Sequence, residues 1–549
     1  MTKYDPSAYR EFFEHEFSYI GGFWRNTHRY ANHVALIDPI GGTEWSYSDL
    51  GVKVGELSSG LIELGVAEGD VVAYQLFNGA EFAQLYLACQ AAGAIGSPIN
   101  YRLASGEVAF IIDDSLPKVF VYDTSLAKVV DSALGMANHR PQVLVGVGDD
   151  GPLASIRGAK CLRFDEIFID GGRAPQLSKS IYDETTRLYT SGTTGMPKGV
   201  PLNSAVELFS AHDVIMHFPL VPEDRTLNMT PWFHRGGLYS GGPNPIFYVG
   251  AAAVPMRSFD PNLCLDYVER LKLTFLIGAP TNLAMLAKAQ SEQPRDLGSL
   301  RGIVTMGAPL DRAAALSYQN LLTPRIFNGY GTTEAFWNTF LRPTDLPEHA
   351  GSAGRACTDD DVAVVKLFEN RLASPDETVA KNGAEIGEVI VRSPKSGFAY
   401  LGMRSEDMAR FHNGWLHIGD LATWDEEEFV TIVGRKDDML ISGGENVHPV
   451  QVEEILNEHS GIADSLVVGV PDAQWGTRVV AYVVRRDLTL TAAQCDEFCR
   501  QHRMLSGYKR PRAYRFVDSL PLTATGKKLH YKAMMTAANE YADNLFEVP

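Results

Sequence analysis

The segment YTSGTTGMPKG, residues 189–199, gathers three glycines, four Ser or Thr hydroxyls and one lysine within eleven residues. Glycine lets backbone N–H groups approach an anion closely, while hydroxyls and a lysine ammonium donate hydrogen bonds to its oxygens. The composition therefore favours a loop that binds a polyphosphate, although a run of Ser, Thr and Gly is also common in plain surface loops.

The segment differs from the phosphate-binding loop of kinases and motor ATPases. That loop requires a Gly-Lys-Ser/Thr sequence, in which the hydroxyl beside the lysine serves Mg²⁺. Here Met196 and Pro197 separate Gly195 from Lys198, and Gly199 follows the lysine. A kinase or motor ATPase is therefore disfavoured.

Length and charge narrow the class of protein. The 549 residues are too many for a single hydrophobic core, so we expect two or more domains. With 49 Lys and Arg against 67 Asp and Glu, the formal net charge is −18. Because a nucleic-acid backbone requires a basic protein face, we expect no nucleic-acid partner.

The sequence shows no pattern of a membrane span, a signal peptide or a cysteine metal site. The N-terminus is polar, and the most apolar run, residues 82–99, is interrupted by glutamines and glycines, so it predicts a buried helix. The six cysteines form no CxxC pair. Cys495 and Cys499 lie one helical turn apart and leave half a metal site as the alternative, but reduced thiols in a cytoplasmic protein are the simpler interpretation.

The order of the patterns predicts two domains. Strand patterns alternate with helical ones in the first part of the chain, which indicates parallel α/β sheets. From about Glu385 closely spaced strands indicate a small β-barrel-like part, and a compact α+β stretch follows. The predicted strands are 71–76, 118–123, 274–280, 302–309, 325–331, 464–470 and 479–485, and the predicted helices are 81–92, 262–273, 449–458 and 492–502.

The fold class is therefore α/β, with a large N-terminal domain of layered sheets over residues 1–436 and a small α+β C-terminal domain over residues 437–549. The boundary lies in the charged segment GRKDDM, residues 434–439. Such a segment is either a passive tether or a hinge.

Five further motifs follow the opening segment. They are PWFHRGG (231–237), NGYGTTEA (328–335), GWLHIGD (414–420), GRKDDMLISGGENVHP (434–449) and PLTATGKK (521–528). In this order and spacing the chain resembles the adenylate-forming superfamily of acyl-CoA synthetases, aryl-CoA ligases, peptide-synthetase adenylation domains and luciferases. The resemblance covers residues 35–532 and is greatest to ligases for aryl, alicyclic and medium-chain carboxylates.

The resemblance implies a reaction in two halves that uses ATP, Mg²⁺ and coenzyme A. A carboxylate first attacks the α-phosphate of ATP and gives acyl-AMP and pyrophosphate; a thiol then displaces AMP, and the reaction is reversible until pyrophosphate is removed. Because two anions must meet, catalysis consists largely of charge neutralisation and positioning. Lys527, which follows Gly526, matches the lysine that bridges the carboxylate and the α-phosphate, and its neighbour Lys528 is the rejected alternative.

Motif positions imply the nucleotide site. Thr190 and Glu334 match the residues near Mg²⁺, and Asp420 matches the acid that accepts both ribose hydroxyls, since a carboxylate suits a cis-diol. The full set that we expect to contact ATP or AMP is Thr190, Ser191, Gly192, Thr193, Thr194, Gly195, Lys198, Gly307, Ala308, Pro309, Asn328, Gly329, Tyr330, Gly331, Thr332, Thr333, Asp420, Arg435 and Lys527.

The sequence defines the pocket for the carboxylic acid less clearly than it defines the nucleotide site. His234 matches the family residue beside the acyl carboxylate, and Gly331 replaces the tryptophan that closes the pocket of acetate-specific relatives. Arg235 either meets a second polar group on the acid or points away, and the second is favoured because pockets for apolar acids rarely bury an unpaired charge. The expected walls are Phe233, His234, Gly236, Gly237, Leu238, Ala279, Thr281, Gly331, Phe336 and Trp337.

Basic residues favour coenzyme A as the thiol. The family resemblance also implies a hinge at Asp437 and a pantetheine tunnel lined by Gly443 and Gly444. A solvated basic loop is the alternative interpretation. The expected coenzyme A contacts are Arg102, Gly443, Gly444, Glu445, Trp475, Arg478, Tyr508, Lys509 and Arg510.

Two other functions compete with the ligase. A stand-alone adenylation enzyme that loads a carrier protein would share every nucleotide motif, and it is disfavoured by the basic cluster and by the lack of a fused carrier domain. A non-catalytic protein on this fold would have lost catalytic residues, and none of Lys198, Glu334, Asp420, Arg435 and Lys527 is lost. The oligomeric state stays open, a homodimer included.

Overall fold

The computed structural model describes most of the chain. The described residues are 4–148, 159–191, 197–307, 310, 312–368, 371–397, 399–402, 410–436, 440–442, 445–472, 475–502, 505, 507, 509–522 and 527–549. They form two compact units, of which the first comprises residues 1–361 and 391–416 and the second residues 362–390 and 417–549. Asp437, where we expect the hinge, lies outside the described residues, so the functional boundary at 436/437 stays a prediction.

The first unit contains a seven-stranded sheet. Its strands are parallel apart from β8 and β9, which form an antiparallel pair. In spatial order they are β7 (Lys160–Arg163), β6 (Val143–Val147), β5 (Val119–Asp123), β3 (Val71–Gln75), β4 (Ile95–Pro98), β8 (Glu184–Ser191) and β9 (Pro197–Asn203).

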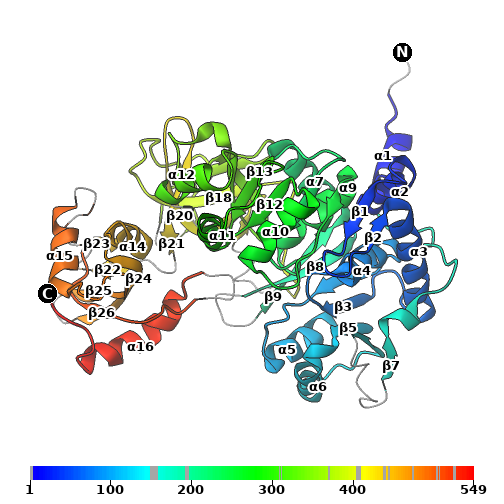
Figure 1. Ribbon diagram of the computed structural model, residues 1–549, viewed down its shortest axis with the longest axis horizontal. Helices are drawn as coiled ribbons and strands as arrows, with labels where there is room; N and C mark the ends of the chain where they lie inside the picture. Colours follow the sequence, from blue (N-terminus) through cyan, green and yellow to red (C-terminus); the bar gives the residue numbers. More distant parts are fainter. Residues whose placement is uncertain are drawn as a thin grey trace. The chain divides into compact units, whose positions relative to one another are not determined.

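Helices cover both faces of this sheet (Figure 1). Val72, Val121 and their alternate neighbours belong to the core that includes α3 and α4, whereas Ala73 and Phe120 pack with α5 and α6. This follows from the two-residue period of a strand buried on both faces. The helices are α3 (Tyr47–Glu63), α4 (Ala80–Ala91), α5 (Ser105–Ser115) and α6 (Ala127–Met136), preceded by α1 (Ser7–His15) and α2 (Tyr19–Arg29).

A nine-stranded sheet completes the first unit. Four consecutive parallel strands, β10, β12, β13 and β14, lie at its centre, and β15 runs antiparallel to β14. Its spatial order is β16 (Arg355–Ala356), β15 (Phe336–Leu341), β14 (Ile326–Thr332), β13 (Gly302–Met306), β12 (Phe275–Gly278), β10 (Arg225–Asn228), β11 (Ala252–Ala253), β1 (Val34–Ile37) and β2 (Glu44–Ser46).

The helices of this region follow the strands in the alternation that the sequence predicts. Helix α11 packs on β12 and β13, and α12 packs on β14 (Figure 1). The helices are α7 (Ser204–His217), α8 (Arg235–Tyr239), α9 (Pro243–Val249), α10 (Pro261–Leu271), α11 (Pro280–Glu292) and α12 (Arg312–Leu321).

Closely spaced strands form a small sheet, as the sequence predicts after residue 385. Most of its residues belong to the second unit. It contains β17 (Asp361–Val365), β18 (Gly387–Arg392), β20 (Trp415–Trp424), β19 (Phe411–His412) and β21 (Val430–Arg435), and the short hairpin β22 (Leu440–Ser442)–β23 (Glu445–Val447) follows in the chain.

The rest of the second unit is an α+β layer. Val467, Val479 and Ala481 pack with α14 and α15, whereas Val468 and Val480 pack with α16, so a three-stranded sheet is covered on both faces. The elements are α14 (Pro449–Asn457), β24 (Ile462–Asp472), β25 (Gly476–Arg485), α15 (Ala492–Gln501), β26 (Tyr514–Phe516) and α16 (His530–Ala542).

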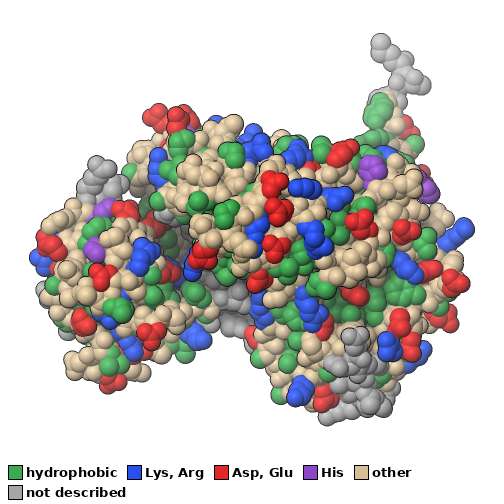
Figure 2. All heavy atoms as spheres, in the orientation of Figure 1, with side chains coloured by type: hydrophobic (Ala, Val, Ile, Leu, Met, Phe, Trp, Pro, Cys, Tyr) green, Lys and Arg blue, Asp and Glu red, His purple; other side chains and the backbone are tan. Residues whose placement is uncertain are grey.

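Two further observations bear on partners. Within the described residues, no helix combines the length and the apolar character that crossing a membrane requires. On the face drawn in Figure 2, acidic and basic side chains are interspersed rather than gathered into patches of one sign.

Candidate active site

Four neighbouring parallel strands bring the predicted site segments to one edge. The segment with His234 follows β10, Ala279 follows β12, Gly307 follows β13, and Tyr330 lies at the end of β14. These strands are adjacent in the sheet, with β12 paired to both β10 and β13. In open α/β sheets, ligands bind outside the carboxyl ends of the strands, so the topology gathers these motifs at a site of the expected kind.

The opening segment forms the tip of the β8–β9 hairpin. Thr190 pairs with Lys198 and Ser191 with Pro197, so the strands lead directly into and out of the loop. Gly199 has a structural role, because an added Cβ would lie 3.2 Å from that of Leu401 and 3.3 Å from the ring of Tyr189. The predicted phosphate contacts Gly192, Thr193, Thr194 and Gly195 lie outside the described residues.

Tyr400 connects the hairpin to the predicted Mg²⁺ carboxylate. The Lys198 ammonium lies 5.4 Å from the centre of the Tyr400 ring, and the Tyr400 hydroxyl donates a hydrogen bond to Glu334 Oε1. Burial, followed by the charge of Glu334, raises the pKa of Tyr400, so this hydroxyl stays protonated. Tyr400 belongs to none of the six motifs, so no sequence pattern marked it as a site residue.

The donor set fits a hard divalent cation. Thr190 offers a hydroxyl and Glu334 a carboxylate, and both residues are only partly buried, so water and phosphate oxygens have access. Mg²⁺ is typically held by one or two protein oxygens together with substrate phosphates and water. Thr190 pairs with Lys198 in the β8–β9 hairpin, and Glu334 accepts the hydrogen bond of Tyr400. The oxygen atoms of Thr190 and Glu334 are compatible with the predicted Mg²⁺.

The segments predicted to enclose the adenine lie on neighbouring strands. Met306, the last residue of β13, pairs with Gly329 of β14, which sets Gly307 beside the segment from Asn328 to Tyr330. Gly307 has φ of +83°, a conformation that favours glycine where the chain leaves the strand. Ala308 and Pro309 lie outside the described residues.

Buried Asn228 fixes the turn that carries His234. Its side-chain amide donates to the backbone oxygens of Gly236, Gly237 and Ser240 at 3.1, 3.2 and 2.8 Å. The short helix α8 begins one residue after His234, so these bonds orient the histidine's backbone. Sequence reasoning missed Asn228, since a lone asparagine at a strand end has no distinctive pattern.

Close packing explains the glycines of this turn. A Cβ on Gly237 would lie 1.9 Å from the backbone oxygen of Pro231, and one on Gly236 would lie 3.0 Å from the sulfur of Met306. A Cβ on Gly331 would collide with the backbone oxygen of Phe336. Larger residues at 237 and 331 therefore require the backbone to move, whereas position 236 is limited only by a flexible methionine.

An aromatic row joins the turn to Arg102. Phe233 lies beside His234, with ring centres 4.3 Å apart, and makes an edge-on contact with Tyr101 at 5.1 Å. The exposed Arg102 guanidinium lies 4.9 Å from the Tyr101 ring centre. One acyl-pocket residue and one coenzyme A residue of the prediction are thus connected through Tyr101.

Other predicted pocket residues have mixed environments. Phe336 and Trp337 are buried and stacked, and Trp337 also contacts Phe218 and Phe340 in the core. Leu238 is likewise wholly buried. Ala279 is partly buried at the start of α11, and Thr281 is exposed. Their role as pocket walls stays a prediction.

Arg235 is bound by the protein itself. It is 3% exposed, and its guanidinium donates to the backbone oxygens of Thr333 and Lys395, the latter at 2.7 Å. The rings of Tyr239 and Phe336 lie 5.3 and 5.4 Å from it. Burial lowers its pKa to about 10. These contacts agree with the interpretation in which Arg235 does not meet the acid.

The second unit brings together its three predicted nucleotide residues. Asp420 and Arg435 are paired in the register of β20 and β21, and Arg435 Nη1 lies 2.6 Å from Asp420 Oδ1. Loss of hydration lowers the pKa of Lys527, Asp420 opposes that shift, and Arg435 adds to it. A carboxylate paired with a guanidinium is suited to hold a ribose and a phosphate.

The basic residues predicted to contact coenzyme A differ in the partners that they bind within the protein. Arg478 pairs with Asp472 at 2.6 Å and Arg510 with Asp496 at 2.6 Å, whereas Lys509 donates to neutral Gln451 at 2.8 Å. Trp475 is 43% exposed. Binding through Arg478 or Arg510 requires exchange of a carboxylate partner. Gly443, Gly444, Tyr508 and the side chain of Glu445 lie outside the described residues.

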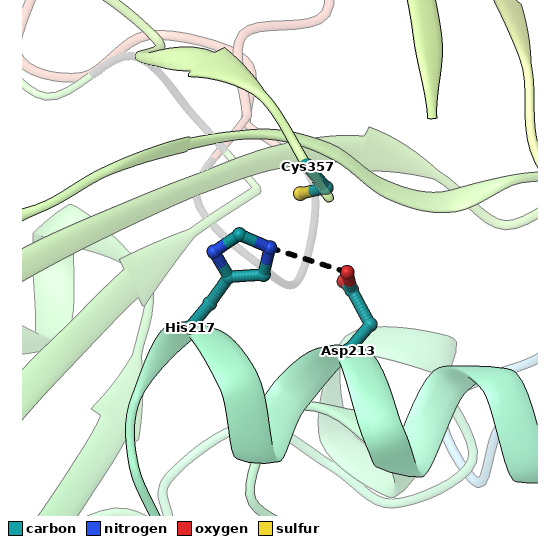
Figure 3. Close-up of side chains that lie close together, drawn as sticks. All are labelled: Asp213, His217 and Cys357. Carbon is teal, nitrogen blue, oxygen red and sulfur yellow. Dashed lines mark ion pairs between the residues drawn. The ribbon is translucent and has the colours of Figure 1, made fainter. Parts of the chain in front are cut away.

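Figure 3 shows a buried group with the composition of a metal site. Asp213 and His217 on α7 and Cys357 each offer one ligand atom, all within 4.8 Å of one another. However, the Lys395 ammonium, 1% exposed, lies 3.0 Å from Asp213 and 2.9 Å from Asp360. The lysine already neutralises these carboxylates, so we assign the group to an internal ion-pair network. Cys495 and Cys499 are buried and free.

Two family models match the chain. Residues 23–401 match the family model described as AMP-binding enzyme, and residues 451–527 match the model described as AMP-binding enzyme C-terminal domain. The chain is 32% identical over 492 residues to a feruloyl-CoA synthase of Amycolatopsis sp, covering 89% of this chain and 93% of that protein. It is 32% identical over 486 residues to the indoleacetate–CoA ligase of Aromatoleum aromaticum, covering 88% and 91%.

Solved structures agree with the fold. A crystal structure of an anthranilate CoA ligase in complex with anthranoyl-AMP superposes with a TM-score of 0.84 at 26% identity, over 96% of this chain and 98% of that one. An amide bond synthetase from Marinactinospora thermotolerans gives a TM-score of 0.81 at 26% identity, over 95% and 100%. The two names differ in the bond that the proteins make, so the fold alone does not define the acyl acceptor.

Proposed function

The chain belongs to the AMP-binding enzyme family, and from this premise we propose that it is an AMP-forming carboxylic acid–CoA ligase for an aromatic, alicyclic or medium-chain acid. The observation that carries the proposal is the linked arrangement of Lys198, Tyr400 and Glu334 at the base of the phosphate-loop hairpin. The named acids of the relatives, feruloyl and indoleacetate, support an aromatic substrate.

The first half-reaction joins the acid to AMP. A carboxylate oxygen forms a bond to the α-phosphorus of ATP, the bond from that phosphorus to the bridging oxygen breaks, and pyrophosphate leaves. We propose that Lys198 and the loop hydroxyls bind the leaving phosphates, and that His234 lies beside the acid. Lys527 supplies the mobile charge that lets two anions meet, a role suited to a compact ammonium on a flexible stem.

We propose roles for five further residues around the nucleotide and its metal ion. Asp420 accepts the ribose hydroxyls, and Arg435, 2.6 Å from Asp420, contacts the ribose or a phosphate. Thr190 and Glu334 would hold Mg²⁺, which neutralises phosphate charge when bound. Tyr400 keeps one Glu334 oxygen oriented through its hydrogen bond.

The second half-reaction forms the thioester. The coenzyme A sulfur bonds to the acyl carbon, and the bond from that carbon to the AMP oxygen breaks, which releases AMP. We propose that Arg102, Trp475 and Lys509 contact the coenzyme A nucleotide; the side chains of Arg102 and Trp475 are exposed and accessible.

Pyrophosphate release tests the proposal. The protein would be incubated with ATP, Mg²⁺ and acids from acetate through hexanoate, cyclohexene carboxylate and benzoate to palmitate, with and without coenzyme A. We expect a preference for one acid class together with turnover that depends on coenzyme A. Adenylation that ignores coenzyme A would instead favour an enzyme that loads a carrier protein, and the absence of adenylation with every acid would overturn the proposal.

A further inference from the structure

We propose that Lys528 is a positioning residue for Lys527, acting through a partly buried ion-pair clamp formed with Glu453, Asp464 and His530. The inference rests on the proposed function, because it assigns a task to the neighbour of the proposed catalytic lysine. All four residues of the clamp belong to the second unit.

Lys528 forms ion pairs with two elements of the α+β layer. Its ammonium lies 3.0 Å from Glu453 Oε2 on α14 and 2.8 Å from Asp464 Oδ1 on β24. Burial opposes its charge, but the two carboxylates raise its pKa, so Lys528 remains an ammonium. A lysine held by two carboxylates is not available as the mobile charge of the reaction.

Glu453 is the centre of the clamp. It is 3% exposed, its Oε1 lies 2.6 Å from His530 Nε2, and the same oxygen accepts the Val467 N–H at 2.8 Å. Burial alone would raise its pKa, yet His530 and Lys528 together lower it, so the group is a carboxylate. Removal of one partner from a buried charge strongly destabilises the folded protein. The contacts of Glu453 therefore resist rearrangement.

The clamp fixes the backbone on the C-terminal side of Lys527. Lys528 forms a β-bridge with Leu522, the Leu529 N–H donates to the Pro521 backbone oxygen at 2.9 Å, and His530 begins α16. Adjacent side chains in extended backbone point to opposite sides. With Lys528 directed to Glu453, Lys527 is directed elsewhere, and its charge interacts with Asp420 and Arg435.

Loss of the clamp should affect the two half-reactions differently. Lys527 is proposed to act in adenylation, so loosening its backbone anchor should affect that half-reaction alone. A displacement of about 1 Å at a reacting group costs on the order of 100-fold in rate. A general loss of packing would instead lower both half-reactions together.

The test compares Lys528→Met and Lys528→Arg with the wild type in separate half-reactions. We expect Lys528→Met to lower the kcat of acyl-AMP formation by on the order of 100-fold, while thioester formation from supplied acyl-AMP changes by less than about twofold. Lys528→Arg should recover most of the adenylation rate, because a guanidinium also reaches two carboxylates. The control is Lys381→Met, which removes an exposed ion pair with Glu428 at 2.5 Å in the same unit.

The outcomes are distinguishable. Adenylation by Lys528→Met at the wild-type rate, or equal loss in both half-reactions, would overturn the inference while the ligase function stands. A wild type that adenylates no acid would overturn both. If Lys528→Met fails to fold, Asp464→Asn is the second variant. Asp464 is 39% exposed and also bonds Asn457 and the Ser465 N–H, so we expect Asp464→Asn to fold. A selective fall in adenylation would support the clamp, and unchanged adenylation would contradict it.

Discussion

At the scale of single residues, the candidate site depends on side chains outside the motifs as much as on those within them. Lys198 and Glu334 lie in recognisable motifs, and sequence alone was enough to select them. Tyr400, which contacts both, lies 66 residues from Glu334 in the chain, and only the fold brings them together. Non-local contacts of this kind have no local sequence signal.

Removal of the Tyr400 hydroxyl tests its role. Tyr400→Phe retains the ring near Lys198 but frees Glu334, so we expect the Mg²⁺ concentration that half-saturates ATP binding to rise severalfold with little change in thermal stability. Equilibrium titration of ATP binding at increasing Mg²⁺ measures this. The matched control is Tyr482→Phe, which removes a similar hydroxyl-to-carboxylate bond to Glu540 at 2.5 Å elsewhere; an equal shift in both variants would contradict the assignment.

Arg235 is the residue for which sequence left two alternatives, and the structure favours the one in which it points away from the acid. Arg235→Met leaves two buried backbone oxygens without their donor, and each such loss costs about 1–3 kcal/mol. We therefore expect a clear fall in the free energy of unfolding, measured by chemical denaturation, together with slower adenylation because Thr333 adjoins Glu334.

Arg295 supplies the comparison for that variant. Its side chain is also buried, at 7% exposure, and it bonds Asp266 and Asn262 away from the site. Arg295→Met should lose stability but retain the adenylation rate per folded molecule. Equal effects of the two substitutions on that rate would show that Arg235 has no special connection to the site.

At the scale of elements, the sequence predicted the parallel core well because its strands are short apolar runs. The predicted strand 118–123 is β5, and the predicted helix 81–92 is α4, each within one residue. The antiparallel pairs β8–β9 and β14–β15 were not foreseen. Register and direction depend on which strands meet across a loop, and a phosphate loop or a glycine bulge does not have the usual hairpin turn sequence.

The α14–β24 layer should be sensitive to acid through Glu453. The pKa of Glu453 is below its unfolded value of 4.5, so its ionised form stabilises the folded state above that pH. This contribution declines as the pH falls below 4.5, where the unfolded chain takes up the proton, and is lost once the pH has fallen through the lower pKa of the folded state. We expect Glu453→Gln to be less stable than wild type at pH 7 and to lose less of its remaining stability between pH 5 and pH 3.

Circular dichroism during urea unfolding at each pH measures that difference. Glu540→Gln is a suitable control, because Glu540 is more exposed than Glu453 and makes a comparable set of bonds, to Tyr482 and Arg515, outside the clamp. Identical pH profiles for wild type and Glu453→Gln would show that another group governs the acid response.

At the scale of the whole molecule, the proposal divides one reaction between two compact units. Lys198, Glu334 and His234 belong to the first, and Asp420 and Lys527 belong to the second. The family resemblance implies that the smaller part changes position between the half-reactions, with Asp437 as the hinge. The sequence could name this residue only through its motif, since a hinge is defined by motion rather than by packing.

Asp437→Pro tests the hinge. Proline fixes φ near −65° and removes the backbone N–H, so the chain at 437 could no longer adopt two different conformations. We expect one half-reaction to be retained near its normal rate and the other to fall by at least about tenfold, measured separately as pyrophosphate release and as thioester formation from supplied acyl-AMP. Asp437→Ala, which leaves φ free, should retain both. Normal rates of both half-reactions in the proline variant would remove Asp437 from the mechanism, because a fixed φ at a true hinge must trap the units in one of their two working arrangements.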